Sequence, residues 1–164
     1  MSDSALTRPH RGLPSWLALL GYAAAVVIVA ALGGVAASNS GQTYDRLDLP
    51  PFAPPSAVFG PVWTTLYAMI ALSGWLVWRR VGIDAAMAPY VVQLVLNAAW
   101  TPLFFAAGWY GVALVEIVLL LAAIGVTIAQ FWSRSRPAAL LLVPYAAWVA
   151  FATCLNASIW WLNR

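Results

Sequence analysis

The sequence contains no lysine, one histidine and one cysteine, and charged residues occupy only 8% of its 164 positions. A lone cysteine excludes an intramolecular disulfide. The single histidine, His10, lies outside every apolar run and no HExxH motif occurs, so a metalloprotease or a histidine-dependent serine protease lacks its essential residues. The chain also offers no general acid–base set. We therefore expect no enzyme, no catalytic residues, no metal site and no obligatory cofactor.

Apolar residues, by contrast, dominate the chain. They make up 63% of it, ten residues are tryptophan, and the mean hydropathy is +0.84. Such values indicate an integral membrane protein rather than a soluble domain of this length. The net charge of +3 comes from arginines in short tracts between apolar runs. This distribution is typical of membrane topology signals, so we expect a lipid bilayer and no nucleic acid as partner.

Five apolar runs reach the length of about 20 residues that a bilayer-spanning helix needs. They cover residues 15–37, 58–78, 85–107, 109–131 and 138–162. Because backbone polar groups in lipid must be satisfied within the segment, the fold class predicted is an all-α integral membrane protein. Residues 15–164 form its single five-helix transmembrane bundle, preceded by an N-terminal arm at residues 1–14. A signal peptide is the alternative for the first run, but the run's length favours a retained helix.

Only the first connection, residues 38–57, is long. It begins with polar residues and continues with four prolines, Pro50, Pro51, Pro54 and Pro55. Prolines hold the chain near polyproline geometry and lack a backbone donor. This loop is therefore expected to be ordered before it binds anything.

Three predicted helices each carry aromatic residues on one face, and two of these faces also carry polar residues. Lipid-facing asparagine and glutamine are unfavourable, so these faces should point into the bundle. At helical spacing the faces are Phe59, Trp63, Tyr67, Ile70 and Gly74; then Gln93, Asn97, Trp100, Thr101 and Phe104; and finally Tyr145, Trp148, Ala152, Leu155 and Asn156. The pattern alone is compatible with a ligand pocket and with interhelical packing.

Prolines within two of these helices favour local irregularity. Pro102 and Pro144 each remove a backbone donor and free a carbonyl one turn earlier, which could widen the space between the helices. Gly74 and Ala152 are small enough to leave room for a broad ligand.

Several motifs, in order along most of the chain, resemble one family. "LPPFAPP" follows Tyr44-Asp45-Arg46-Leu47, and "VWTTLY", "NAAWTPLFF" and "VPYAAWVAFATCLN" come later. This series resembles the tryptophan-rich sensory protein/translocator protein family, also called the peripheral-type benzodiazepine receptor family. That family is known for a five-helix bundle, often dimeric, whose pocket under the first loop binds tetrapyrroles such as protoporphyrin and haem.

The resemblance implies a membrane tetrapyrrole-binding sensor or carrier with the proline-rich loop as a lid. It also implies that a homodimer is possible. Six residues match the family's ligand-contacting or pocket positions: Tyr44, Trp63, Asn97, Trp100, Trp148 and Ala152. Phe59, Tyr67 and Phe104, which share the same faces, complete the predicted ligand-binding set. The first helix adds nothing to the resemblance.

Glu116, the one carboxylate within a predicted span, supports an alternative, a proton-coupled small-molecule exporter. It shares a stripe with Trp109, Ala123, Thr127 and Gln130 that should face protein rather than lipid. In the first interpretation Glu116 is structural, and in the second it is needed for transport.

Arginine placement predicts the orientation. Six arginines lie in the N-terminal arm and in the second and fourth connections, against Arg46 and Arg164 on the opposite side. Because positive residues stay cytoplasmic, the N-terminus is expected inside and the C-terminus outside, in a bacterial cytoplasmic membrane.

Overall fold

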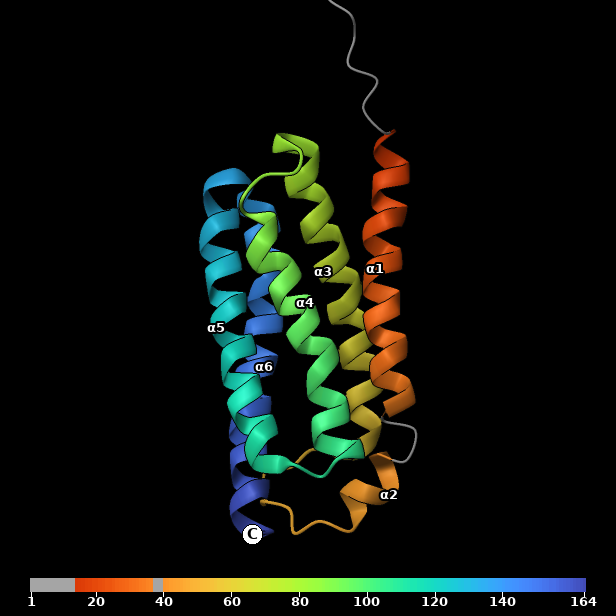
Figure 1. Cartoon of the computed structure of the whole chain (residues 1–164), viewed down its shortest axis with the longest axis vertical. Coiled ribbons are helices and arrows are strands. Elements are labelled where there is room, and N and C mark those ends of the chain that lie inside the picture. Colours follow the sequence, from red (N-terminus) through yellow and green to blue (C-terminus); the bar gives the residue numbers. More distant parts are fainter. Residues whose placement is uncertain (1–13, 37–39) are drawn as a thin grey trace, which may run out of the picture.

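Five long helices stand side by side in a bundle (Figure 1). The structure, a computed structural model, describes residues 14–36 and 40–164. Within them the five predicted membrane spans are confirmed, and the all-helical fold class with them. The long helices are α1 Ser15–Ala36, α3 Phe59–Val81, α4 Met87–Thr101, α5 Tyr110–Arg134 and α6 Arg136–Leu162. Apart from residue 14, the predicted N-terminal arm lies outside the described residues.

Charged helix ends explain where the predicted bounds differ from those observed. Both α3 and α5 continue three residues beyond the apolar runs, through Arg79, Arg80 and Arg134 in their last turns. Arginine is favourable there because it complements the carbonyl end of the helix dipole. The predicted bounds stop earlier because an apolar run ends at its first charged residue. Helix α6 begins at Arg136, two residues earlier than expected, and has a proline in its first turn.

The third predicted helix is not uniform. After Thr101 the chain continues as a π-helical turn, η2 (Pro102–Ala106), in which the N–H of Ala107 donates to the carbonyl of Pro102 over 2.9 Å. Gly108, at φ +65°, then ends the segment. The irregularity expected at Pro102 is therefore present as a widened turn, while Pro144 lies within the continuous helix α6.

The loop at the lower end of Figure 1 contains a helical turn that the sequence did not predict. This turn, α2 (Ser40–Asp45), precedes the proline-rich stretch, and a 3₁₀ turn, η1 (Ser56–Val58), leads into α3. Glycine and threonine are weak helix formers, so propensity gave no signal for α2. Its anchor is Tyr44, which is buried against the bundle.

Helix neighbours divide the bundle into two sides. α1 packs on α3 and α4, whereas α5 packs on α4 and α6. α3 also packs on α6 and so links the two sides. α1 therefore lies at one side of the bundle, where it packs against α3 and α4.

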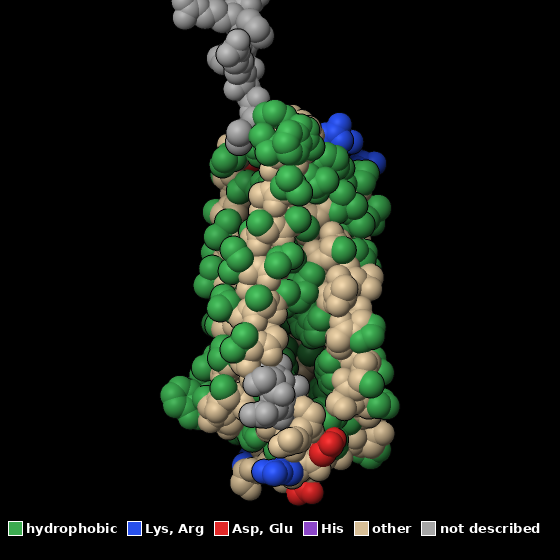
Figure 2. All heavy atoms as spheres, turned by 90° about the vertical axis from the view of Figure 1, so that its right-hand side faces the viewer, with side chains coloured by type: hydrophobic (Ala, Val, Ile, Leu, Met, Phe, Trp, Pro, Cys, Tyr) green, Lys and Arg blue, Asp and Glu red, His purple; other side chains and the backbone are tan. Residues whose placement is uncertain are grey.

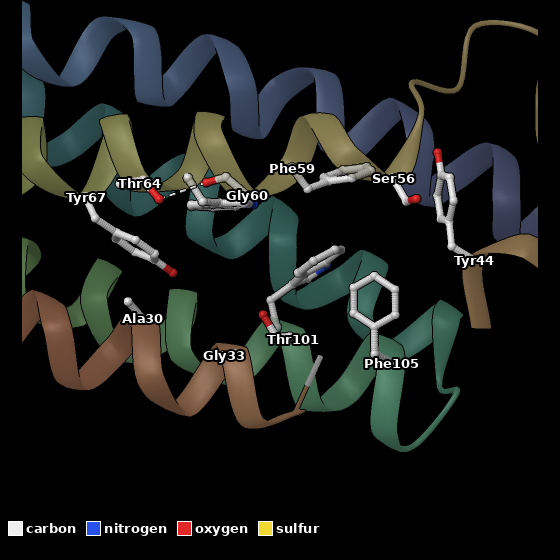
Figure 3. A pocket seen from close by; sticks show the side chains of 13 residues that line it. Ala30, Gly33, Tyr44, Ser56, Phe59, Gly60, Thr64, Tyr67, Thr101 and Phe105 are labelled. Atoms are coloured by element: carbon white, nitrogen blue, oxygen red, sulfur yellow. Dashed lines mark hydrogen bonds between the residues drawn. The ribbon is translucent and has the colours of Figure 1, made fainter. Parts of the chain in front are cut away.

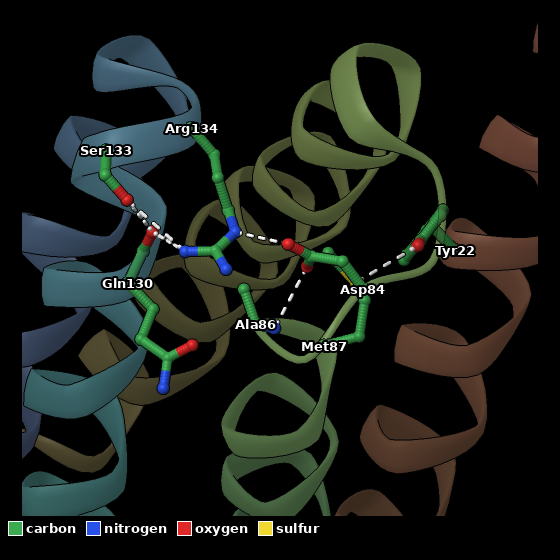
Figure 4. A network of polar contacts seen from close by, with 7 residues as sticks. All are labelled: Tyr22, Asp84, Ala86, Met87, Gln130, Ser133 and Arg134. Atoms are coloured by element: carbon green, nitrogen blue, oxygen red, sulfur yellow. Dashed lines mark hydrogen bonds and ion pairs between the residues drawn. The ribbon is translucent and has the colours of Figure 1, made fainter.

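At the end opposite the loop, an ion pair joins the α3–α4 connection to the last turn of α5 (Figure 4). The Arg134 guanidinium donates to the Asp84 carboxylate, and Arg80 donates to the Arg134 carbonyl over 3.3 Å. The hydrogen bond from Arg134 lowers the pKa of Asp84 below its ordinary value. This pair fastens the α3–α4 connection to the end of α5.

Gly74 does not border an open space, contrary to the expectation that it leaves room for a ligand. A Cβ at this position would lie 2.7 Å from the ring of Tyr90 and 2.9 Å from Tyr22. Tyr90 itself is held in place, because its hydroxyl donates to the Ile70 carbonyl over 3.0 Å and its ring stacks on Phe131. The small residue accommodates a core tyrosine.

Gly74→Ala should therefore destabilise the bundle by about 1–3 kcal/mol, because the added methyl overpacks a site that cannot yield. Gly125→Ala is the matched control, since Gly125 lies within α5 with nothing within 4 Å of its Cβ position. Thermal unfolding in detergent would measure both. Equal melting temperatures for the two variants would contradict this packing.

Candidate functional site

A cavity of ≈ 330 Å³ lies at the loop end of the bundle, between α1, α3 and α4 (Figure 3). Residues of α1, α2, α3, α4 and both irregular turns line it. They are Ala30, Gly33, Gly34, Tyr44, Ser56, Phe59, Gly60, Trp63, Thr64, Tyr67, Trp100, Thr101 and Phe105.

Six of the thirteen residues that line the cavity are aromatic. On α3, Trp63 and Tyr67 lie one turn apart with ring centroids 5.3 Å apart, and Phe59 contacts Tyr44 edge to face at 5.6 Å. Trp100 comes from α4 on the opposite wall. Flat rings on two walls leave a space suited to a planar apolar molecule.

α1 contributes the third wall, which the sequence analysis missed. Ala30, Gly33 and Gly34 face the cavity and leave it wide because they are small. A Cβ at Gly33 would meet the Thr101 hydroxyl at 3.5 Å, so the helices approach closely there. The available signal was the cluster of small residues at the end of the first run.

A second compartment lies behind the aromatic residues, toward α5 and α6. It is a void of ≈ 20 Å³, lined by Asn97, Trp148 and Ala152 among others. Three aromatic residues border both spaces and so separate them: Phe59, Trp63 and Trp100.

The predicted ligand-binding residues thus fall into groups. Five of them line the large cavity: Tyr44, Phe59, Trp63, Tyr67 and Trp100. Asn97, Trp148 and Ala152 line the second compartment, and Phe104 borders a further void of ≈ 20 Å³ under the loop. The structure brings all nine to one end of the bundle but does not enclose them in one open space.

Two asparagines tie the walls together. Asn97 accepts a hydrogen bond from the Tyr67 hydroxyl over 2.9 Å and donates to the Tyr145 hydroxyl over 3.0 Å. Asn156 accepts from the Trp100 indole over 3.1 Å and donates to the Tyr110 carbonyl over 2.9 Å. These bonds join α3, α4, α5 and α6 at the level of the cavity.

Two hydrogen-bonded contacts order the loop, one within it and one to the end of α6. The Tyr44 hydroxyl donates to the Pro54 carbonyl over 3.1 Å, and burial raises the pKa of this tyrosine. The side chain of Asn163, at the end of α6, both accepts from the Asp48 N–H and donates to the Asp48 carbonyl, each over 3.0 Å. This second fastening joins positions 115 residues apart in the sequence and was not predicted.

Glu116 lies in the interior of the bundle. Among the described residues, neither of its carboxylate oxygens has a hydrogen-bond partner. The stripe predicted to face protein is only partly confirmed, because Glu116 and Thr127 are buried whereas Trp109 is 60% exposed. Trp109 immediately precedes α5 at the membrane end, where an amphipathic ring is favourable.

Comparison with known proteins gives the relationship. The sequence profile of the TspO/MBR family matches residues 22–162. The chain belongs to this family. It is 38% identical over 153 residues to the human translocator protein, covering 90% of each chain. It is 32% identical over 148 residues to the tryptophan-rich sensory protein of Cereibacter sphaeroides, covering 90% of this chain and 92% of the relative. The family resemblance is thus confirmed, as is the multi-pass membrane character.

The matched region begins at Tyr22 and so includes most of α1. The first helix is therefore part of the family fold, although the sequence motifs did not include it. This agrees with the position of α1 as a cavity wall.

Asn163→Ala should loosen the loop, because it removes both hydrogen bonds to Asp48. Two bonds of about 1 kcal/mol each predict at least about tenfold faster amide exchange around Asp48, measured by hydrogen-exchange mass spectrometry. In the control Ser158→Ala, only an intrahelical bond to the Cys154 carbonyl is lost. If the loop exchanged at the same rate in both variants, the Asn163 contact would not hold it.

Proposed function

We propose that this family member is a membrane tetrapyrrole-binding sensor or carrier without catalytic activity, and that protoporphyrin or haem binds beneath the loop. The observation that carries the proposal is the ≈ 330 Å³ cavity with aromatic rings on two walls. Stacking on such rings favours a flat conjugated ligand. The names of the relatives, sensory protein and translocator protein, agree with a sensing or carrying role.

A broad macrocycle would extend from the large cavity into the second compartment. Phe59, Trp63 and Trp100 line both spaces, and we expect rotation of the Trp63 or Phe59 side chain to merge them. Beyond it, the Trp148 indole N–H has no acceptor among the described residues. A buried donor without a partner is costly, so a ligand acceptor at this point would be stabilised.

Trp63→Ala should weaken protoporphyrin binding at least about tenfold, because the loss of one stacking wall costs about 1–3 kcal/mol. The shift of the porphyrin absorption band gives the affinity without depending on protein fluorescence. Val118→Ala, on the exposed face of α5, is the control. Equal affinities in the two variants would overturn the proposed site.

Two cavity-filling variants distinguish the compartments. Gly33→Leu would fill the space beside α1, and Ala152→Leu the space beside α6. A macrocycle that spans both compartments predicts weaker binding in each variant. Loss in Gly33→Leu alone would confine the ligand to the large cavity, and no loss in either would exclude both.

Glu116 favours a second candidate, a proton-coupled small-molecule exporter. A carboxyl group inside the bundle without a hydrogen-bond partner among the described residues is the type of group that takes part in proton coupling in membranes. We place this candidate second because Glu116 lines neither the large cavity nor the adjoining void.

Glu116→Gln separates the two candidates. In the binding proposal, the affinity for protoporphyrin and the melting temperature should change little, because the amide keeps the shape of the carboxyl group. pH-dependent porphyrin efflux from proteoliposomes that this substitution abolishes would favour the exporter. Val118→Ala again serves as the control. Asn97→Ala would not, because it removes the hydrogen bonds to Tyr67 and Tyr145 on other helices.

We also propose a bacterial cytoplasmic membrane as the location, with the N-terminus inside and the loop and C-terminus outside, and a homodimer as the assembly. Four arginines at the ends of α3 and α5 and at the start of α6 support this orientation: Arg79, Arg80, Arg134 and Arg136. A reporter that is active only in the cytoplasm, fused after Arg164, should give no signal. A strong signal would reverse the orientation.

A further inference from the structure

A second hollow of ≈ 280 Å³ lies between α1 and α3, on the outer surface of the bundle. In Figure 2, which faces α1, a depression runs beside this helix with hydrophobic side chains along it. We call it the α1–α3 groove. Its lining residues are Ala23, Val26, Val27, Ala30, Thr64, Tyr67, Ala68 and Ala71.

The groove adjoins the large cavity. Ala30, Thr64 and Tyr67 line both spaces, so only these residues separate the cavity from the groove at this side. α1 has hydrogen bonds to its neighbours only near its start, among the described residues. The Trp75 indole donates to the Ser15 carbonyl, and Tyr22 donates to the Met87 sulfur. Among the described residues, no hydrogen bond joins α1 to α3 along residues 23–30, beside the groove.

The groove offers water no free hydrogen-bond donor. The Thr64 hydroxyl donates to the Gly60 carbonyl within its own helix over 2.9 Å, and the Tyr67 hydroxyl donates to Asn97. The remaining lining residues are alanine and valine. Water needs two or more polar partners to occupy a cavity stably, so this lining favours an apolar occupant.

Its position in the helices places the groove in the hydrocarbon layer. Residues 23–30 lie in the middle of α1, a 22-residue helix long enough to cross a membrane. Beside the groove, Val27 and Ile28 are exposed and apolar, as lipid-facing residues are. An apolar hollow that opens here faces the lipid chains of the bilayer.

We propose that the α1–α3 groove binds one acyl chain of a bilayer phospholipid, whose end reaches the cavity at Ala30 and Tyr67. The groove suits a single chain because small alanines on both helices, Ala23 and Ala30 on α1 and Ala68 and Ala71 on α3, leave an apolar hollow of ≈ 280 Å³ between them. The loop covers the cavity at its other side, where Asn163 fastens it to the end of α6. In this proposal the cavity is therefore reached laterally from the membrane, past the side chains of Ala30, Thr64 and Tyr67.

Photolabelling tests the lipid site directly and without a porphyrin. The full chain is placed in phosphatidylcholine nanodiscs that contain a phospholipid with a diazirine at the end of one acyl chain, and peptide mapping locates the adducts. We expect preferential labelling of residues 23–30 and 64–71. Ala68→Leu, which fills the groove without lining the large cavity, should reduce this labelling at least fivefold.

The matched control is Ala122→Leu, at an exposed position of α5, which should leave labelling of the groove unchanged. Circular dichroism and melting temperature show whether each variant is folded. If Ala68→Leu does not fold, Ala68→Val fills less of the groove and should give a smaller reduction.

Three results would overturn the proposal. These are equal labelling of all lipid-facing helices, unchanged labelling in a folded Ala68 variant, and a groove that stays unlabelled while α5 is labelled. The last result would mean that another occupant, such as a second copy of this chain, covers the groove.

A further arm rests on the proposed porphyrin function. Protoporphyrin in the cavity should displace the chain end and reduce labelling at Ala30 and Tyr67 but not at Ala23. If absorbance titration shows no porphyrin binding, the proposed function fails, whereas the labelling of the ligand-free protein still decides the lipid site.

Discussion

The need to pair polar side chains inside an apolar bundle organises the loop end of this protein. Asn97 and Asn156 each bridge two partners on other helices, and together they connect α3, α4, α5 and α6. In a low-dielectric interior such bonds contribute about 0.6–2 kcal/mol each and also determine helix register. The aromatic rings keep their positions around the cavity because the tyrosines and tryptophan that these amides bind cannot turn freely. α1 lies outside this network, which is why space remains beside it.

Sequence periodicity predicted the five spans and the inward direction of Asn97, Trp63 and Tyr67, because a buried amide or aromatic face at helical spacing has few alternatives in lipid. It did not predict the π turn after Pro102, since proline indicates a disturbance but not its form. α2 and the Asn163 contact were also missed. Both depend on tertiary partners that are distant in the sequence, and neither leaves a periodic signal. The role of α1 was missed because small residues indicate close approach without indicating what is approached.

The division of the site between two spaces follows from residue size. Bulky rings at Phe59, Trp63 and Trp100 fill the middle of the bundle, whereas alanine and glycine on α1 leave the outer part open. A pattern that marks inward-facing residues cannot distinguish a ring that fills space from one that borders it. Packing against the neighbouring helix decides whether a ring fills a space or borders it, and this packing is seen only in the three-dimensional structure.

The contact between Asn163 and Asp48 makes the end of the chain part of the loop that covers the cavity. Any ligand large enough to lift the loop away from α6 must also break the Asp48–Asn163 hydrogen bonds, directly after the last turn of α6, which carries Trp160 and Trp161 at the membrane boundary. Occupancy inside the bundle would then be visible outside it, as a change in how the C-terminal residues meet the lipid surface or a neighbouring protein. Such a change would pass directly from the loop to the C-terminus and would need no rearrangement of the helical core.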